Sequence, residues 1–265
     1  MNRRTWTLAL AASLSATLAA PSFADEPTRL RILSYNIHHG EGMDGKLDLE
    51  RIAGVIKSVD PHVVALQEVD RGVARTQGVD EPGELARLTG MTPIFERNIV
   101  FQGGDYGNAV LTRLPVTAWR NVHVPSHYVG EQRGALVIEL TAPDAEKTQI
   151  RFMATHIDYR GDDAERMDSV NKLEEVAREH PERPTLLVGD LNSLPDSRVM
   201  KAFGENWTRT DSSPLPTFPA DKPDRQIDYV LVRPAPRWKV VESRVLDEPV
   251  ASDHRPLLVV LELVD

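Results

Sequence analysis

Alternating and continuous apolar runs along the chain predict many short strands. Residues 29–35 (RLRILSY) alternate apolar and polar side chains, as a half-buried strand does. Residues 62–66 and 185–188 are short apolar runs bounded by turn residues, which is typical of buried strands. Pro, Gly and charged turns separate the further predicted strands, at residues 108–113, 116–124, 134–140, 149–157, 227–232, 238–246 and 256–263.

Three segments show helical spacing instead. The first carries Leu49, Ile52, Ala53 and Ile56 on one face before Asp60-Pro61 interrupts the pattern. Residues 83–89 predict a short helix that ends at Gly90. Residues 163–179 predict the clearest helix, which Pro181 stops. Its apolar face comprises Met167, Val170, Leu173, Val176 and Ala177.

The order of these elements indicates the fold class. Helices and strands are interleaved, but several strands follow one another directly, which favours mixed sheets over a purely parallel one. Two packed sheets with helices outside would use this pattern well. No Pro, Gly or Ser linker divides residues 25–265, so we expect a single domain there. The Pro-rich stretch 212–223 is predicted to be a loop at the rim of a site.

The first 24 residues have the features of a cleaved signal peptide. Arg3 and Arg4 precede an apolar, small-residue-rich run, and Ser22-Phe23-Ala24 fits a cleavage site. The run is too short and too rich in Ala and Ser to span a membrane well. We therefore expect export to the periplasm or the extracellular space, with the twin-arginine route left open. We also expect a monomer without a stable membrane span.

Charge and cysteine content narrow the function classes. Loss of residues 1–24 removes two arginines and no acid, so the net charge of −9 becomes −11. Tight, sequence-independent binding to nucleic acid depends on Lys and Arg, so this acidity disfavours it without excluding a local basic groove. The chain has no cysteine, which excludes disulfides and thiol chemistry.

Apolar strands repeatedly end on polar residues that strands disfavour. A single such residue is commonly a turn residue, and His156 alone would as readily be structural. As a set they offer carboxylates, amides and imidazoles, and hard oxygen ligands without thiolates favour Mg²⁺ or Mn²⁺. Such a set suits hydrolysis of a phosphate ester. Its members are Asn36, Glu68, His156, Asp190, Asn192, Asp228, Asp253 and His254.

In this order and spacing, the motifs resemble those of the endonuclease/exonuclease/phosphatase superfamily. The motifs are SYNIHHG at Ser34, LQEVD around Glu68, GDLN at Gly189 and SDHRP at Ser252. The resemblance covers nearly all of residues 25–265. It implies a four-layer α/β sandwich, in which two mostly antiparallel mixed sheets lie face to face and helices flank them.

The resemblance also implies a role for each residue. Glu68 corresponds to the main metal ligand, with Asn36 beside it and Asp253 sharing metal binding. Asp190 and Asn192 stand where the family positions the attacking water and a phosphate oxygen. His254 resembles the general base or phosphate-contacting histidine, and Asp228 the carboxylate that orients it. His156 resembles the second histidine, which contacts the phosphate and protonates the leaving group. Arg133, in QRGAL, matches an arginine that organises the site.

One departure concerns DYGNAVLTR, which contains Tyr106 and Asn108. Some secreted nucleases of the family have a Glu shortly after a Tyr, and that Glu supports the second histidine. Asn108 lies in this region here and could bond a phosphate or a substrate hydroxyl instead. Asp158 is expected to point the same way as His156 without pairing with it. For His38 and His39 we favour a solvated loop over a place at the rim.

The sequence leaves three functions to weigh. We favour a phosphodiesterase or phosphatase acting on a small or lipid-derived phosphoester, because the chain is acidic and lacks a basic, aromatic-interleaved tract. An extracellular endonuclease is the alternative. A binding module on an inactive enzyme fold is disfavoured, since no catalytic residue is missing. Scattered arginines are candidates for a second phosphate, namely Arg71, Arg75, Arg97 and Arg160.

Overall fold

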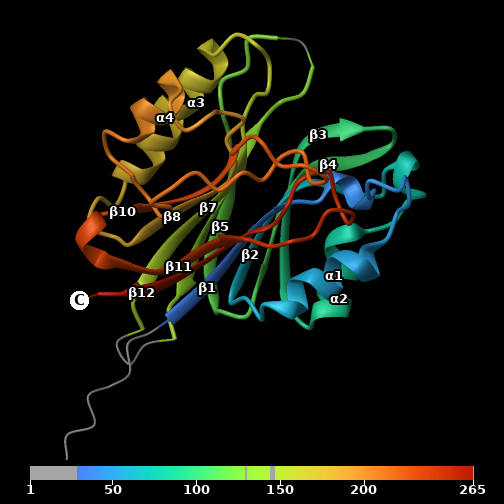
Figure 1. Ribbon diagram of the computed structural model, residues 1–265, viewed down its shortest axis with the longest axis horizontal. Coiled ribbons are helices and arrows are strands. Elements are labelled where there is room, and N and C mark those ends of the chain that lie inside the picture. The colour runs from blue at the N-terminus through green and yellow to red at the C-terminus, as the bar shows by residue number, and fades with distance from the viewer. Residues whose placement is uncertain (1–28, 129, 144–146, 265) are drawn as a thin grey trace, which may run out of the picture.

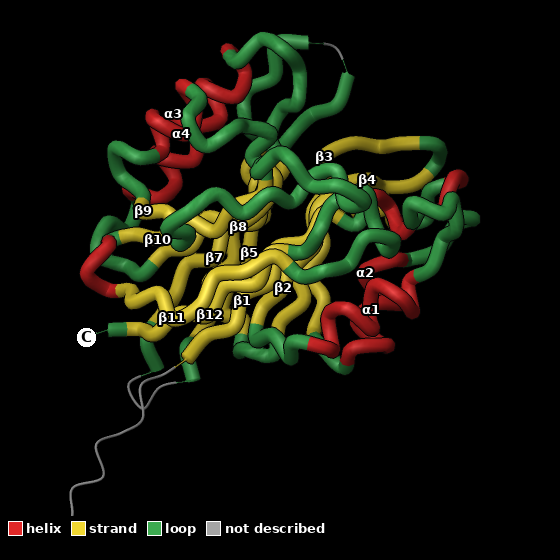
Figure 2. Tube along the Cα trace, viewed as in Figure 1, coloured by secondary structure: helices red, strands yellow, loops and turns green. Residues whose placement is uncertain are grey.

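The computed structural model describes residues 29–128, 130–143 and 147–264, so the predicted signal peptide lies outside the described residues. Two six-stranded sheets pack face to face, and helices cover their outer faces on opposite sides (Figures 1 and 2). This arrangement confirms the predicted four-layer sandwich.

The first sheet holds the N-terminal strands and both C-terminal ones. β1 and β2 are parallel, and every other neighbouring pair in this sheet is antiparallel. In spatial order the strands are β11 (Trp238–Val245), β12 (Leu257–Leu263), β1 (Arg29–Asn36), β2 (Val63–Arg71), β4 (Gly104–Thr112) and β3 (Thr92–Phe101).

The second sheet is built from the middle of the chain. β7 and β8 are parallel, and the other neighbouring pairs are antiparallel. In spatial order the strands are β5 (Val116–His123), β6 (Gly134–Thr141), β7 (Gln149–His156), β8 (Thr185–Asp190), β10 (Asp228–Arg233) and β9 (Thr208–Arg209).

The core between the sheets follows from the two-residue period of strands. Every second side chain of a strand points to the same face. Leu30 and Ile32 of β1 therefore meet Phe152 of β7 and Val188 of β8 in one buried cluster. Burial of each such side chain stabilises the folded state by about 1.5–3 kcal/mol.

The outer faces bury the apolar faces of the helices. α1 (Leu49–Ser58) and α2 (Glu81–Thr89) pack on the first sheet, where Ile52 contacts the cluster that contains Leu33 and Leu66. α3 (Ala164–Arg178) and α4 (Arg198–Phe203) pack on the second sheet through Leu173 and Phe203. None of the helices in the described ranges is long and apolar enough to cross a membrane.

Several elements were missed or misjudged at the sequence level. β3 was not predicted, because Pro93 and its polar neighbours weaken the strand pattern; Pro93 is tolerated since β3 lies at a sheet edge. α4 and the short helices η1 (His38–Gly40), η2 (Ala74–Thr76) and η3 (Ala235–Arg237) were also missed. β2 runs to Arg71, five residues beyond the predicted end.

Candidate active site

The strand period carries polar side chains into the space between the sheets. In β1, Asn36 stands four residues after Ile32 and therefore shares its inward face. In β7 and β8, His156 and Asp190 continue the inward rows that contain Ala154 and Val188. The polar residues thus replace the apolar core at one end of the sandwich.

Strand register brings three of these residues into one row. β7 pairs in parallel with β8 so that His156 lies opposite Asp190, and β10 pairs antiparallel with β8 so that Asp228 also lies opposite Asp190. The distance from His156 Nε2 to Asp190 Oδ2 is 3.4 Å. Residues 72 positions apart in the chain, His156 and Asp228, therefore flank a central carboxylate.

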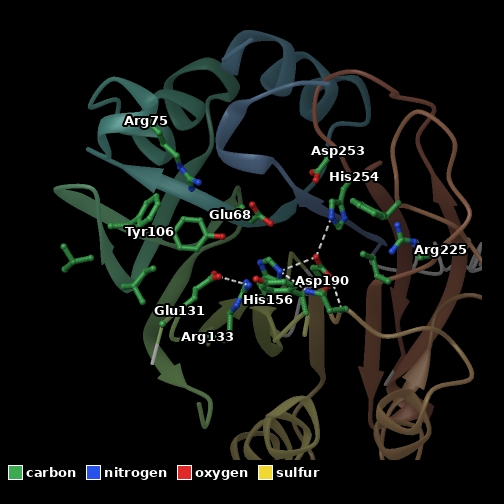
Figure 3. Close-up of a pocket in the computed structure, with 18 residues that line it drawn as sticks. Glu68, Arg75, Tyr106, Glu131, Arg133, His156, Asp190, Arg225, Asp253 and His254 are labelled. Carbon is green, nitrogen blue, oxygen red and sulfur yellow. Dashed lines mark hydrogen bonds and ion pairs between the residues drawn. The ribbon is translucent and has the colours of Figure 1, made fainter. Parts of the chain in front are cut away.

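A β-bulge in β2 places Glu68. Leu66 and Val69 both pack toward the helices, although regular alternation would put residues 66 and 68 on one face. The extra residue leaves Glu68 with a positive φ of 57° and directs its carboxylate into the cavity (Figure 3). Its Oε1 accepts a hydrogen bond of 3.0 Å from Asn36 Nδ2.

Asn36 joins the two sheets at the site. Its side chain is fully buried, and its Nδ2 also lies 3.3 Å from Asp190 Oδ2. Ser252 Oγ donates to the backbone carbonyl of Asn36 at 2.7 Å, which anchors the loop that carries Asp253 and His254. The side-chain amide of Asn36 thereby fixes the position of Glu68, in one sheet, relative to Asp190, in the other.

Asn192 reaches the site through a turn. β8 ends at Asp190, and Asn192 has a left-handed backbone with a φ of 43°. Its backbone N–H donates to Asp190 Oδ1 at 2.8 Å. Its side-chain amide lies 3.1 Å from His156 Nε2 and donates to the Ile157 carbonyl. The Asp190 carboxylate therefore caps a turn at the end of β8.

His254 and Asp228 form a buried ion pair. His254 Nδ1 lies 2.9 Å from Asp228 Oδ2, which also accepts a 2.6 Å hydrogen bond from Thr217 Oγ1. Burial lowers the pKa of His254, but the carboxylates of Asp228 and Asp190 raise it by more than burial lowers it. The resulting pKa is about 10. The ring is therefore an imidazolium at neutral pH, with Nε2 3.7 Å from Asp190 Oδ2.

The other two titratable groups have opposite shifts. Burial, together with the charge of Asp228, raises the pKa of Asp190 well above that of a free carboxyl. Burial and the charge of Arg133 lower the pKa of His156 well below its ordinary value, so this histidine is neutral. Two histidines on either side of one carboxylate thus differ in charge because only His254 has its own carboxylate partner.

A cavity of about 800 Å³ opens over these groups (Figure 3). Its walls include most of the residues assigned from the sequence: Glu68, Tyr106, Arg133, His156, Asp190, Asn192, Asp253 and His254. Asn36 and Asp228 are buried behind them. Phe218, from the loop predicted to form a rim, lines the cavity and packs against the His254 ring at 4.8 Å.

Asn108 is not among the residues that line the cavity. It is buried, and its Nδ2 donates to the Gly134 carbonyl at 2.9 Å, which ties β4 to β6 across the sandwich. Its Nδ2 is therefore engaged within the fold, and a bond from Asn108 to a phosphate or a hydroxyl stays a prediction. Asp158 pairs with Arg160 at 2.6 Å, in line with the expectation that it does not pair with His156.

Some cavity residues were missed, and their positions explain why. Glu131 pairs with Arg133 at 2.9 Å, and burial raises its pKa, but it lies in a loop without a motif. Arg225 likewise follows the rim loop without a pattern. Of the scattered arginines, Arg75 lines the cavity and binds Asp70 through two hydrogen bonds, of 2.8 and 2.9 Å. Arg71 and Arg97 instead pair with Asp105.

The donor set fits a divalent cation of the Mg²⁺ or Mn²⁺ class. Three carboxylates, Glu68, Asp190 and Asp253, share the cavity and offer oxygen ligands. Asp190, Asp228 and His254 also bring ligand atoms within 4.8 Å of one another. Asp228 and His254, however, already neutralise each other, so Glu68 with Asp190 and Asp253 is the better oxygen-rich set.

For His38 and His39 we expected a solvated loop, but the structure buries His39. His39 is only 8% exposed, and neither ring lines the cavity. Both residues have left-handed backbones, with φ of 45° and 44°. Together with Glu68 they bring three possible ligand atoms within 4.8 Å of one another.

Comparisons with known proteins agree with this geometry. A model of the Endonuclease/Exonuclease/phosphatase family matches residues 33–254. YbhP of Escherichia coli K12, an uncharacterized protein, is 28% identical over 241 residues, which cover 86% of this chain and 94% of YbhP.

Solved structures share the fold. An endonuclease/exonuclease/phosphatase from Beutenbergia cavernae is 26% identical with a TM-score of 0.72, over 89% of this chain and 72% of that one. A mannosyl-6-phosphatase from Bacteroides thetaiotaomicron is 19% identical with a TM-score of 0.72, over 89% of this chain and all of that one.

Proposed function

The chain belongs to the endonuclease/exonuclease/phosphatase family, whose members hydrolyse phosphoesters, and we propose that it is a divalent-metal-dependent phosphodiesterase or phosphatase. The observation that carries the proposal is the buried His254–Asp228 pair, which faces Asp190 and Glu68 in one cavity. Such a set can activate water and stabilise charge on phosphorus-bound oxygens.

Asp190 is the group best suited to accept a proton from water. Its raised pKa lies nearer to neutrality than that of an ordinary carboxyl, as a general base requires. The backbone N–H of Asn192 holds one carboxylate oxygen of Asp190 and leaves the other toward the histidines. Water held by this oxygen would attack phosphorus in line with the leaving group.

His254 is the principal donor to the phosphoryl group. It is an imidazolium at neutral pH, and Asp228 holds its Nδ1, so Nε2 is free to donate to an oxygen that gains charge. His156 is neutral, and its Nε2 receives the Asn192 amide. Proton delivery to the leaving group from this atom would require Asn192 to turn away.

A divalent cation bound by Glu68, with Asn36, Asp190 and Asp253 around it, would draw charge from the phosphoryl oxygens. Arg133 also lines the cavity, and its ion pair with Glu131 fixes its position. It can therefore bind a phosphate oxygen without moving.

A small or lipid-derived phosphoester is the favoured substrate. The chain carries a net charge of −9, and the reacting groups lie inside a cavity of about 800 Å³, the size of a small-molecule site. The mannosyl-6-phosphatase with the same fold acts on a sugar phosphate, as its name states. An extracellular endonuclease is the second candidate, since Arg75 and Arg225 flank the cavity on opposite sides and could hold a nucleic-acid backbone (Figure 3).

The test is a substrate panel with the protein of residues 25–265 and defined Mg²⁺ or Mn²⁺. The panel comprises bis-p-nitrophenyl phosphate, p-nitrophenyl phosphate, sugar phosphates, phosphoinositides, sphingomyelin and plasmid DNA. Asp190→Ala and His254→Ala should each lower kcat by roughly two to four orders of magnitude. EDTA should abolish the activity, and Mg²⁺ or Mn²⁺ should restore it.

His180→Ala, which removes an exposed histidine, is the matched control and should keep full activity. Near-normal rates in both site variants, or indifference to EDTA, would overturn the proposal. Rapid nicking of plasmid DNA at low enzyme concentration would instead favour the endonuclease.

Export and domain organisation are part of the same proposal. We infer that residues 1–24 are removed during export, which leaves a single catalytic domain of residues 25–265 in the periplasm or outside the cell. N-terminal sequencing of the protein from fractionated cells should begin at Asp25. Sedimentation of that protein should give the mass of a monomer.

A further inference from the structure

We propose a second divalent-cation site, formed by His38, His39 and Glu68 and suited to a transition ion such as Zn²⁺. One possible ligand atom from each residue lies within 4.8 Å of the other two. Two imidazoles and a carboxylate, completed by water, are a common ligand set for Zn²⁺. Nitrogen donors favour Zn²⁺ over Mg²⁺, which prefers oxygen.

The site is distinct from the cavity in which phosphoesters are proposed to react. Glu68 lines that cavity, whereas neither His38 nor His39 does. Glu68 Oε1 accepts a hydrogen bond from Asn36, so the carboxylate is held by the reaction centre and also faces the histidines. The second ion would therefore share Glu68 with the centre.

The backbone is strained at all three ligands. His38, His39 and Glu68 have positive φ values of 45°, 44° and 57°. A non-glycine residue in this region is strained, and such strain persists where the surroundings impose it. The two imidazole rings lie edge to face, with their centroids 4.5 Å apart, beside the bulge that carries Glu68.

The hydrogen bonds of the histidines leave ligand atoms available. His39 is buried, and its Nδ1 has no hydrogen-bond partner in the described structure. Two other ring nitrogens lie near Glu41. His39 Nε2 is 3.6 Å from Glu41 Oε2, and His38 Nδ1 is 3.2 Å from the Glu41 carbonyl oxygen. A buried imidazole nitrogen without a partner is costly, and a cation bound at this nitrogen would satisfy it.

The surrounding charges are compatible with a cation. Arg75 is near His39, but its guanidinium is paired with Asp70 through two hydrogen bonds. Glu41 adds a further carboxylate next to His39. The cluster therefore carries net negative charge when Glu68 is ionised.

The test measures metal binding and not hydrolysis, so it is independent of the proposed function. Co²⁺ is titrated into the protein of residues 25–265 while the visible absorption is recorded, with Mg²⁺ in excess to fill oxygen-rich sites. A nitrogen-containing site of low coordination number gives intense bands, which an octahedral oxygen site does not. Calorimetry with Zn²⁺ gives the stoichiometry and affinity.

His39→Asn and His38→Gln should each remove the intense bands and weaken Zn²⁺ binding more than about tenfold. Asn tolerates a left-handed backbone, so His39→Asn preserves the local conformation. His38 is only half-buried, which makes His38→Gln the variant less exposed to misfolding.

Two controls separate this site from other imidazoles. His123→Ala with His180→Ala removes two exposed histidines and should leave the bands unchanged. His156→Ala with His254→Ala removes the histidines of the cavity and should also leave them. Unchanged Co²⁺ bands in His38→Gln, or their loss only when the cavity histidines are removed, would overturn the site.

Discussion

Burial alone would make His254 a weaker base than a free histidine, and Asp228 reverses that effect. The raised pKa of about 10 comes chiefly from the carboxylate that contacts Nδ1. A raised pKa in the folded state means that the charged pair stabilises the fold below the unfolded pKa near 6.5. This contribution is lost as the pH rises through about 10.

Asp228→Asn should therefore lower the pKa of His254, because the attraction is removed while the burial remains. NMR titration of the His254 ring gives the pKa directly. Asp253→Asn is the matched control, since Asp253 contributes the smallest of the raising effects and should shift the pKa less. An equal pKa in wild type and Asp228→Asn would contradict this account of the pair.

Glu81, in the first turn of α2, gives a pH dependence of the same sign at lower pH. Burial is the largest cause that raises its pKa, to about 8, although the Asp70 N–H donates to its Oε2 at 2.8 Å. Because the folded pKa lies above the unfolded value of 4.5, the fold favours the protonated acid. Stability should fall as the pH rises from about 4.5 to about 8.

Glu81→Gln should remove that fall and raise the free energy of unfolding at pH 9 by about 1–3 kcal/mol relative to wild type. Urea unfolding at pH 5, 7 and 9 measures the difference. Glu84→Gln, at a half-buried position of the same helix, should leave the pH dependence in place. A wild-type stability that does not change between pH 5 and 8 would refute the assignment.

At the scale of elements, Gly189 permits the close pairing of β7 and β8. A Cβ on Gly189 would lie 1.9 Å from the Thr155 carbonyl oxygen, and the φ of 145° disfavours any side chain. Asp190 follows directly and depends on this pairing for its place opposite His156.

Gly189→Ala should destabilise the protein by several kcal/mol, because the backbone must move to relieve the clash. The same movement should displace Asp190. Gly54→Ala is the matched control: Gly54 lies in α1 with nothing within 4 Å of an added Cβ. That substitution should stabilise the protein by about 0.5–1 kcal/mol. Urea unfolding compares the two, and equal effects would contradict the steric argument.

At the scale of the whole molecule, the proposed metal centre joins the two sheets. Glu68 belongs to the first sheet and Asp190 to the second, and Asn36 contacts both carboxylates. A cation bound there links layers that otherwise meet through apolar packing and a few hydrogen bonds. It should therefore stabilise the sandwich as a unit.

Mg²⁺ at about a hundredfold excess over its Kd should raise the free energy of unfolding by about 2.7 kcal/mol. Glu68→Gln should lose most of this gain, because it removes the proposed main ligand. Thermal unfolding with and without Mg²⁺ measures both. If Mg²⁺ left the wild-type unfolding temperature unchanged, Glu68 would not hold a cation of this class.

Local pattern accounts for much of the fold and of the site. The two-residue period of the strands predicted the sheets, and it also marked Asn36, His156 and Asp190 as polar residues that end inward-facing apolar rows. These inferences succeed because neighbouring residues in a strand impose the direction of a side chain. The rule does not extend to Asn192, where a side chain–backbone hydrogen bond starts a turn.

Other features depend on partners that are distant in the chain. The bulge that turns Glu68 inward, the bond from Asn108 to the Gly134 carbonyl and the burial of His39 all arise from packing between separate elements. Glu131 and Arg225 reach the cavity from loops whose composition shows no pattern. The sequence by itself determined which chemical groups end the strands, whereas tertiary structure alone decided the distances between them, because register and loop paths depend on contacts far apart in the chain.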